Sequence, residues 1–413
     1  MLATMGGGVA VGDYDGDDNV DLFFTGSVEN GKKPEAGPCG VLYRNRGDGT
    51  FEDATGRARV HACGWTMGAH WVDIDSDARL DLVVTGLGKT TLWHNLGGTF
   101  EEVSAQRGLA APKFAIGLAA GDPNGDGRAD LYVVNYLETD YAHEQSFPGF
   151  QLRLPEDYAG QDGMLFVQGE DGSFAEGAAQ VGVTNHDGKP LAAAFFDFDA
   201  DGDADLYVTN DRVSNVLYRN RGDGTFEDAT AETGAGQREA KEARAGMGLA
   251  VGDADGDGRP EILVTNYAGE PISVYRNVEG VLFDDASESS GISLASTPQV
   301  QWGTDFVDLD DDGWPDVVAV SGNLIPRIFN FFGSLFRKAD FEFYRRGNRG
   351  YRQPPLVWRN LGEGRFTDVS ATAGDFAGVR VSARGLGAGD VDGDGRVDLA
   401  IAAVSSPIYI NAY

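Results

Sequence analysis

The 413-residue sequence predicts an all-β fold, a seven-bladed β-propeller built from four-stranded blades. Three observations lead to this prediction. A nine-residue acidic cluster recurs seven times, a β-type run follows each copy, and a turn with a second pair of strand-like runs closes each unit. The composition, with 41% hydrophobic and 24% charged residues, is that of a folded chain with a real core.

The acidic clusters share Asp, Asn or Glu at positions 1, 3, 5 and 9. The copies are DYDGDDNVD at 13–21, DIDSDARLD at 73–81, DPNGDGRAD at 122–130, DFDADGDAD at 197–205, DADGDGRPE at 253–261, DLDDDGWPD at 308–316 and DVDGDGRVD at 390–398. A run of small residues such as GMGLAVG precedes each cluster, and runs such as LYVTN, LYRN and TFEDAT follow it. Each unit is therefore predicted to hold four short strands, with the small residues nearest the ring axis.

The units define blades that start near residues 6, 65, 114, 190, 246, 301 and 383, so residues 1–413 are predicted to form a single propeller. Ring closure is the exception to the pattern. The last unit ends in PIYINAY, which matches a third strand, and no TFEDAT-like run follows it. Two explanations are open: the last blade has three strands and a stub, or flanking sequence has been removed.

The stretch LYRNRGDGTFEDAT occurs twice, at 42–55 and 217–230, and each copy contains the Arg-Gly-Asp tripeptide of many cell-adhesion ligands. Asp-Gly between two strand-like runs is typical of a hairpin turn. The other units place Gly-Gly, Asp-Gly or Glu-Gly there without the tripeptide. The hairpin interpretation is therefore preferred over an adhesion site.

The acidic clusters predict about seven calcium sites. Ca²⁺ binds six to eight oxygens, and a tight loop with alternating carboxylates can supply them. An EF-hand does not fit, because a strand begins directly after position 9. Mg²⁺ is disfavoured because it requires strict octahedral geometry. The remaining alternative is that these are acidic turns that bind no ion. Position 7 is expected to offer its backbone carbonyl. The predicted ligands are Asp13, Asp15, Asp17, Asn19, Asp21, Asp73, Asp75, Asp77, Arg79, Asp81, Asp122, Asn124, Asp126, Arg128, Asp130, Asp197, Asp199, Asp201, Asp203, Asp205, Asp253, Asp255, Asp257, Arg259, Glu261, Asp308, Asp310, Asp312, Trp314, Asp316, Asp390, Asp392, Asp394, Arg396 and Asp398.

The formal net charge of −32 disfavours nucleic acid as a partner, and seven calcium ions would neutralise much of it. No apolar run reaches the roughly 20 residues of a membrane helix, and no secretion signal is visible. The two cysteines, Cys39 and Cys63, fit no zinc motif and fall in connections around the first blade. A disulfide between them and two unpaired thiols both remain open.

These repeats resemble the FG-GAP/VCBS family, the calcium-loop repeats of integrin α-subunit propellers. The closer resemblance is to the cartilage acidic protein family and its bacterial relatives, through LYRNRGDGTFEDAT, the FPG at 147–149 and QPPLVWRNLGEGRFTDVS at 353–370. The resemblance implies a secreted or surface-exposed, calcium-stabilised propeller with an extracytoplasmic location. Many of those relatives continue into a C-terminal domain, which is not expected within this sequence.

Any ligand site is expected on the face opposite the acidic loops, where long insertions fall at 27–40, 136–163 and 322–355. The last insertion is aromatic and basic, which suits either an apolar lid or contact with an anionic ligand. Three residues before most acidic clusters lies a small residue, but two units have His70 and Asp305 instead. The candidate catalytic or ligand-binding residues at the channel mouth are His70, Asp305, Arg384, Arg244, Lys189, Lys113 and Trp302. The alternative is that the two polar residues are merely satisfied in the interior.

The sequence contains no nucleophile elbow, phosphate loop or zinc triad. The first functional hypothesis is a monomeric binding or interaction module for a protein, glycan or small molecule. The alternative is an enzyme of the lyase, dehydratase or cyclase type at the channel mouth, with His70 as acid or base. A third is a purely structural module of a longer protein.

Overall fold

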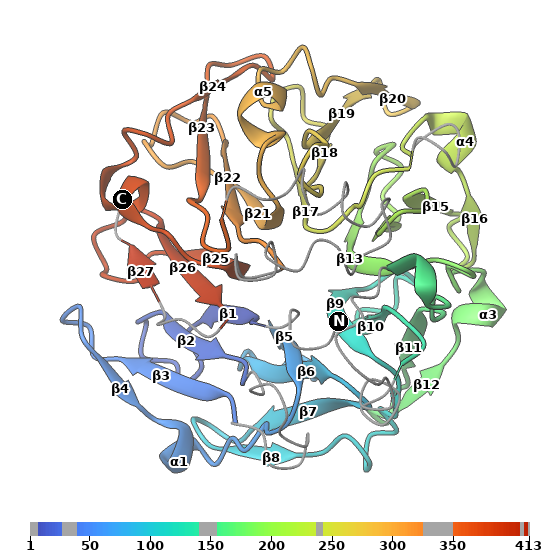
Figure 1. The fold of residues 1–413 in the computed structure, drawn as a ribbon. Coiled ribbons are helices and arrows are strands. Elements are labelled where there is room, and N and C mark those ends of the chain that lie inside the picture. The colour runs from blue at the N-terminus through green and yellow to red at the C-terminus, as the bar shows by residue number, and fades with distance from the viewer. Residues whose placement is uncertain are drawn as a thin grey trace.

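A computed structural model describes residues 7–26, 39–139, 155–236, 243–324, 350–404 and 409–411. Most of the three predicted insertions falls outside these residues. The described chain forms short antiparallel strands that pair in sequence order, with each first strand at the ring axis (Figure 1). No membrane-crossing candidate exists among the described helices, since none has the length and apolar character required.

The first strands of the sheets are β1 (Val9–Gly12), β5 (Thr66–Val72), β9 (Ala115–Gly121), β13 (Pro190–Phe196), β17 (Leu249–Gly252), β21 (Gln301–Val307) and β25 (Ala383–Gly389). The second strands are β2 (Asp21–Phe24), β6 (Asp81–Gly86), β10 (Asp130–Asn135), β14 (Asp205–Asn210), β18 (Glu261–Val264), β22 (Asp316–Ser321) and β26 (Asp398–Ala403). Each second strand starts at position 9 of its acidic cluster, so the clusters are the turns between first and second strands.

The third strands are β3 (Val41–Asn45), β7 (Lys89–Asn95), β11 (Met164–Gln168), β15 (Val216–Asn220), β19 (Ser273–Val278), β23 (Leu356–Asn360) and β27 (Tyr409–Asn411). The fourth strands are β4 (Phe51–Asp53), β8 (Phe100–Glu102), β12 (Phe174–Glu176), β16 (Phe226–Asp228), β20 (Leu282–Asp285) and β24 (Phe366–Asp368). Short helical turns follow several fourth strands or lie in connections: α1 (Thr55–Ala58), η3 (Pro155–Asp157), α3 (Ala178–Val181), α4 (Thr230–Thr233), α5 (Ser293–Ser296) and η6 (Gly374–Gly378).

The prediction of seven four-stranded blades is wrong, because the described residues form six four-stranded blades. The sheet β25-β26-β27 contains three strands in the described residues. The physical reason is that six of the third strands are followed by a TFEDAT-like run that can pair with them, whereas β27 is not. Nor does β1 supply the missing strand, since it pairs with β2 in its own sheet.

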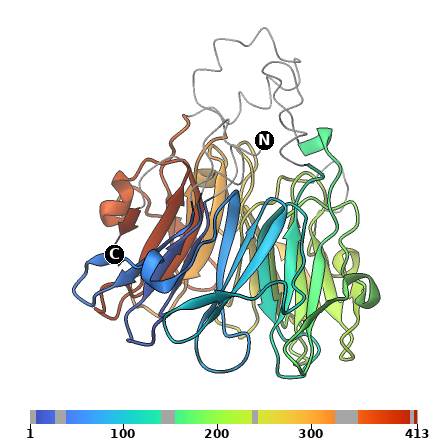
Figure 2. The same ribbon diagram turned by 90° about the horizontal axis from the view of Figure 1, so that it is seen from below.

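The ring nevertheless closes between β1 and β25, which lie against each other while β1 also contacts β5 on its other side (Figure 1). Figure 2 shows the sheets standing side by side around the ring, with their strands running between its two faces. Apolar side chains fill the space between neighbouring sheets; Phe23, Leu82 and Trp93, for example, belong to one buried cluster between the first two sheets. Burial of this apolar surface drives the sheets together.

Polar side chains also join neighbouring sheets at the face that carries the acidic turns. The Asn or Gln at or next to the end of a third strand donates from its side-chain amide to the position-2 carbonyl of the acidic turn in the neighbouring sheet, at 2.6–2.8 Å. The pairs are Asn45 with Val391, Asn95 with Tyr14, Gln168 with Ile74, Asn220 with Pro123, Asn277 with Phe198 and Asn360 with Ala254. We call these bonds the amide ties.

A second set of bonds joins sheets near the axis. Thr25, Thr85, Thr209 and Thr265 lie in or directly after second strands. Each hydroxyl accepts from a backbone N–H in, or directly before, the first strand of its own sheet at 2.7–3.0 Å. It also donates to a backbone carbonyl in, or just before, the first strand of the next sheet at 2.7–3.4 Å. We call these bonds the threonine ties.

Candidate functional site

The acidic turns are shaped by their own backbone. The position-1 carboxylate of Asp13 accepts from the N–H groups of Gly16, Asp17 and Asp18 at 2.8–3.2 Å. Asp73, Asp122, Asp197, Asp253, Asp308 and Asp390 cap their turns in the same way. The position-7 N–H donates to the position-5 carboxylate, as Asn19 does to Asp17 at 3.0 Å. These bonds hold the loop closed around its acidic side chains.

The position-9 carboxylates are buried, with exposed fractions of 0–3%. Asp21, for instance, accepts from the N–H of Tyr14 and of Asn45 at 3.1 and 2.7 Å. In the third sheet, position 2 is Pro123, which has no N–H, and the Asn124 side chain donates to Asp130 instead. Burial raises the pKa of Asp21, Asp205 and Glu261 to about 7. These carboxyls hold the turn and the third strand together, and a nearby cation would favour their charged form.

Carboxylates of the same turn converge in several copies of the repeat. One oxygen from each of Asp13, Asp15 and Asp17 lies within 4.8 Å of the others. Asp73, Asp75 and Asp77 form the equivalent group in the second turn. In two other turns the group uses positions 1, 3 and 9, with Asp197, Asp199 and Asp205 in one and Asp253, Asp255 and Glu261 in the other. Oxygen-rich sets of this kind match the preference of a hard divalent cation such as Ca²⁺.

Arginines lie against several of these groups. Arg44 on β3 contacts Asp15 at 2.6 Å and also contacts Asp17. Arg359 on β23 reaches Asp310 at 2.7 Å and Asp312 at 3.0 Å. These guanidinium groups offset part of the repulsion among the carboxylates.

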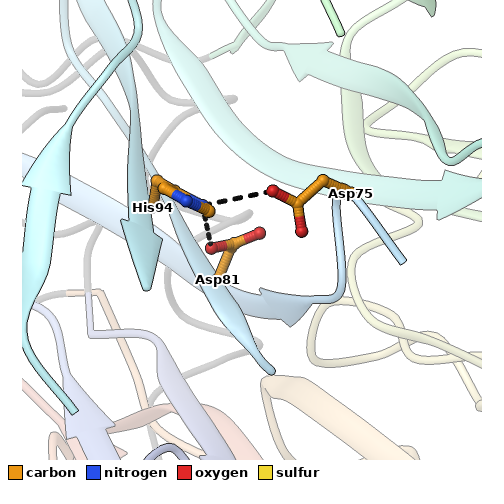
Figure 3. A group of neighbouring side chains, drawn as sticks. All are labelled: Asp75, Asp81 and His94. Atoms are coloured by element: carbon orange, nitrogen blue, oxygen red, sulfur yellow. Dashed lines mark hydrogen bonds and ion pairs between the residues drawn. The ribbon is translucent and has the colours of Figure 1, made fainter. Parts of the chain in front are cut away.

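The second turn differs, because β7 presents His94 where β3 presents Arg44. Its Nδ1 lies 3.0 Å from Asp81 Oδ1 and 3.6 Å from Asp75 Oδ2 (Figure 3). This turn lacks glycine, and Ser76 and Ala78 adopt φ of 59° and 65°, which side-chain-bearing residues seldom do. The second turn therefore departs furthest from the common pattern in both backbone and ligand chemistry.

A cavity of about 300 Å³ lies on the ring axis, at the end of the first strands away from the acidic turns. The first strand of each sheet, or the residues just before it, contributes to its wall. Extra residues interrupt the pairing of β5, β9, β13, β21 and β25 with their second strands there. Such a bulge redirects a side chain out of the normal alternation. The side chains presented at this level are Met67, Ile116, Leu191, Met247, Trp302 and Arg384, with Gly7 as the counterpart in the first sheet.

Arg384 is 8% exposed, and its guanidinium carbon lies 4.2 Å from the centre of the Trp302 ring. Its Nη1 donates to the carbonyl of Ala383 at 2.6 Å and to the hydroxyl of Ser382 at 3.2 Å. Burial lowers its pKa to about 9, so it stays charged at neutral pH. His70 also lines the cavity, and the surrounding protein lowers its pKa to about 4, so it is neutral at pH 7. Among the described lining residues, Arg384 is thus the one formal charge at neutral pH.

The other candidates from the sequence lie elsewhere. Lys113 and Lys189 donate to the carbonyls of Asp162 and Pro155, at 3.0 and 2.8 Å. Arg244 donates to the hydroxyl of Ser273 at 2.7 Å. Asp305 is exposed and does not line this cavity, although nearby protein raises its pKa. The structure therefore brings together His70, Trp302 and Arg384. Separately, Cys39 and Cys63 form a disulfide.

Sequence reasoning missed a buried polar pair on the same side of the ring. Asp211, 7% exposed, accepts from the Tyr136 hydroxyl at 2.5 Å, and burial raises the pKa of Asp211 to about 6. Arg212 beside it reaches Glu156 at 2.9 Å. The sequence did contain a signal for this pair. The second strand of this unit ends in TND at 209–211, whereas the equivalent tripeptides of two other units are VNY and TNY, so an acidic residue replaces a tyrosine.

Comparisons with known proteins agree with this architecture. The chain is 25% identical over 303 residues to cartilage acidic protein 1 of Xenopus tropicalis, covering 72% of this chain and 40% of that protein. It is 27% identical over 176 residues to the human protein of the same name, covering 41% of this chain and 23% of that one. The chain thus spans less than half the length of these relatives.

A solved structure described as "Crystal structure of BBS1N in complex with ARL6DN, soaked with mercury" matches with a TM-score of 0.52 and 9% identity, over 99% of this chain and 91% of that one. At that identity the likeness concerns the fold alone. The family model for the FG-GAP-like repeat matches residues 13–84, 73–133, 197–264 and 253–319, together more than half of the chain. With its propeller of four-stranded blades, the chain belongs to the FG-GAP-like repeat family.

Proposed function

We propose that the chain is a calcium-stabilised, extracytoplasmic binding module whose ligand lies on the face opposite the acidic turns. The observation that carries the calcium part is the convergence of three carboxylates within 4.8 Å in several turns. Like charges at such distances repel unless a cation is present, and carboxylate oxygens are the ligands that Ca²⁺ prefers.

The fit of the ion is supported by two buried oxygens. Asp15 Oδ1 and Asp199 Oδ1, both at position 3, have no hydrogen-bond partner within the described residues. A buried carboxylate oxygen without a partner is costly, and a bound cation would satisfy it. We therefore take Asp15 and Asp199 as proposed ligands, and the number of ions is part of the same proposal.

The extracytoplasmic location is supported by the Cys39–Cys63 disulfide, because such bonds persist in oxidising compartments and are rare in the cytosol. The name of the curated relatives, cartilage acidic protein 1, fits the same location. A binding role fits the axial cavity, which lies at the end of the ring away from the proposed ions.

The test is calcium removal. Ions that bind only the folded state stabilise it, so EDTA should lower the melting temperature by well over five degrees, and added Ca²⁺ should restore it. Calorimetric titration of the stripped protein should then give several ions per chain. An unchanged melting temperature would reject the proposal.

A second candidate, an enzyme at the channel mouth, is favoured by the placement of His70 and Arg384 on one cavity. A general base works best when its pKa lies near the operating pH, and His70 with a pKa of about 4 is a weak one. We therefore place binding first. In the enzyme case, His70→Ala should abolish turnover of an acidic or glycan-like substrate and leave calcium-dependent melting unchanged. Unaltered turnover would remove His70 from the mechanism.

A further inference from the structure

We propose that the second acidic turn binds a divalent transition-metal ion such as Zn²⁺, through His94 Nδ1, Asp75 Oδ2 and Asp81 Oδ1. This inference rests on the proposed role of the acidic turns as cation sites. It goes further, because it assigns one turn an ion other than Ca²⁺ and adds a ligand from outside the turn.

The donor set mixes nitrogen and oxygen. Asp75 lies in the turn between β5 and β6, Asp81 begins β6, and His94 is the next-to-last residue of β7 (Figure 3). Ca²⁺ takes oxygen ligands, whereas an imidazole nitrogen combined with carboxylate oxygens is a usual set for Zn²⁺ and other first-row transition ions. The histidine therefore separates this turn chemically from the others.

The residue at the place of His94 is an arginine in four other sheets, namely Arg44, Arg219, Arg276 and Arg359. An arginine cannot ligate a metal ion, since it stays protonated and offers only N–H donors. Arg44 and Arg359 fill the space beside their turns by contacting the carboxylates directly, at 2.6–3.0 Å. A neutral imidazole is shorter and has a free electron pair, so it can share a cation with carboxylates at the same place.

The spacing of the donors fits one small ion. His94 Nδ1 lies 3.0 Å from Asp81 Oδ1 and 3.6 Å from Asp75 Oδ2, and the three atoms all lie within 4.8 Å of one another. Ligand atoms about 2.1 Å from a tetrahedral ion are about 3.4 Å apart, and the two distances from Nδ1 lie on either side of that value. A proton on Nδ1 can hold the same atoms together, and a metal ion displaces it on binding.

Asp81 is already held in one orientation. It is buried, and its Oδ1 accepts from the N–H of Asn95 at 2.6 Å while its Oδ2 accepts from the N–H of Ile74 at 3.1 Å. Outer hydrogen bonds of this kind orient a ligand and strengthen metal binding. The His94 side chain is 18% exposed, which leaves the ion a path from solvent.

Two arginines lie near this group without filling it. Arg107 Nη2 is 3.7 Å from Asp75 Oδ2, beyond hydrogen-bond distance, and its Nη1 donates to the Gly172 carbonyl at 3.0 Å. Arg79 contacts Asp77, a carboxylate outside the proposed set. The space between His94 and the two carboxylates is therefore not taken by a guanidinium.

The experiment uses calcium-saturated protein without a polyhistidine tag and titrates it with Zn²⁺ in a calorimeter. We expect one tight Zn²⁺ site per chain, and Co²⁺ bound there should give a visible absorption that Zn²⁺ removes. His94→Gln should weaken Zn²⁺ binding at least tenfold. The matched control is His186→Gln, because His186 Nδ1 also lies 3.0 Å from a carboxylate, that of Asp162, but its side chain is 76% exposed. The control should keep the tight site.

A second variant guards against misfolding of the first. His94→Arg copies the residue that four other sheets carry at this place, so it should retain the calcium-dependent rise in melting temperature. It should nevertheless lose the tight Zn²⁺ site and the Co²⁺ absorption.

Zn²⁺ binding that survives both His94 variants, or that is lost in His186→Gln, would overturn the inference. A wild type that Ca²⁺ stabilises but that has no tight Zn²⁺ site would overturn this inference alone. A His94-dependent Zn²⁺ site in a chain that Ca²⁺ does not stabilise would support it and reject the calcium proposal, so the two failures are distinguishable.

Discussion

The side-chain amide of Asn45 donates to the backbone carbonyl of Val391 at 2.6 Å, across 346 positions of the chain. It joins the third strand of the first sheet to the acidic turn of the last. The same amide also donates to Val20 at 3.0 Å in its own sheet. The ring is thus closed by the same amide tie that joins its other sheets, in addition to the packing of β1 against β25.

Removing this tie should destabilise the fold. Asn45→Ala leaves the carbonyls of Val391 and Val20 without this donor in a buried place, so we expect a loss of about 1–3 kcal/mol in the free energy of unfolding. Urea denaturation in calcium-saturated buffer measures it. Asn45→Gln is the control, because Gln168 makes the equivalent bond to Ile74 in the third sheet. Equal stability of the wild type and the alanine variant would contradict the role of the tie.

The two unpartnered oxygens identify the turns to test for calcium. Asp15→Asn and Asp199→Asn should each remove about one ion from a calorimetric titration and reduce the stabilisation by Ca²⁺, because a neutral amide is a weaker ligand. Asp48→Asn, in the exposed hairpin turn between β3 and β4, is the matched control. Unchanged ion counts in both position-3 variants would show that these side chains are not ligands.

The neutral His70 should make stability depend on pH. Its pKa is about 4 in the folded chain and about 6.5 when unfolded, so the unfolded chain binds the proton first. Its contribution is complete above pH 6.5 and is lost as the pH falls towards 4. His70→Ala, which copies Ala119 and Ala250 at the same position, should flatten this part of the curve. His61 is exposed, so His61→Ala should leave the pH dependence of stability unchanged. If both variants lost the same part of that dependence, the assignment to His70 would be contradicted.

The disulfide should contribute to stability as well. Cys39 and Cys63 are 24 positions apart, and closing a loop of that size is worth about 2–4 kcal/mol through the unfolded state. Cys39→Ser combined with Cys63→Ser should therefore lower the urea midpoint. A reducing agent should destabilise the wild type and leave the double variant unaffected. A double variant as stable as the wild type would show that the disulfide does not contribute to the stability of the fold.

Local patterns predicted much of this fold. The acidic clusters placed every turn between first and second strands, because carboxylates and glycines at fixed offsets leave the backbone few alternatives. The Arg-Gly-Asp of the first repeat lies where the hairpin interpretation put it, with Asp48 accepting from the N–H of Thr50 at 3.0 Å. The prediction of four strands in every blade was wrong for the last sheet, which has three strands in the described residues. The lack of a TFEDAT-like run after PIYINAY had left this possibility open.

The sites near the axis were harder to predict, because periodicity does not reveal bulges. Lys113, Lys189 and Arg244 precede their first strands, whereas Arg384 is the second residue of β25. All four were expected at one channel mouth. The register shift at Arg384 directs its side chain to the cavity, while the lysines donate to nearby carbonyls. From the sequence alone, the Asn of LYRN and the Thr of LYVTN were interpreted only as strand residues. Their bonds to neighbouring sheets were not predicted, because those partners are far away in the sequence.

In most of the acidic turns the residue at position 2 bonds to two neighbours, its own position-9 carboxylate and the third strand of the next sheet. The N–H of Tyr14 donates to Asp21 below its own turn, and its carbonyl accepts from Asn95 in the next sheet. Any change in the conformation of one turn is therefore felt by the adjacent third strand, and the influence is mutual by thermodynamic linkage. Ion uptake around the ring should accordingly be cooperative, with a loosened sheet weakening the affinity of the turn beside it.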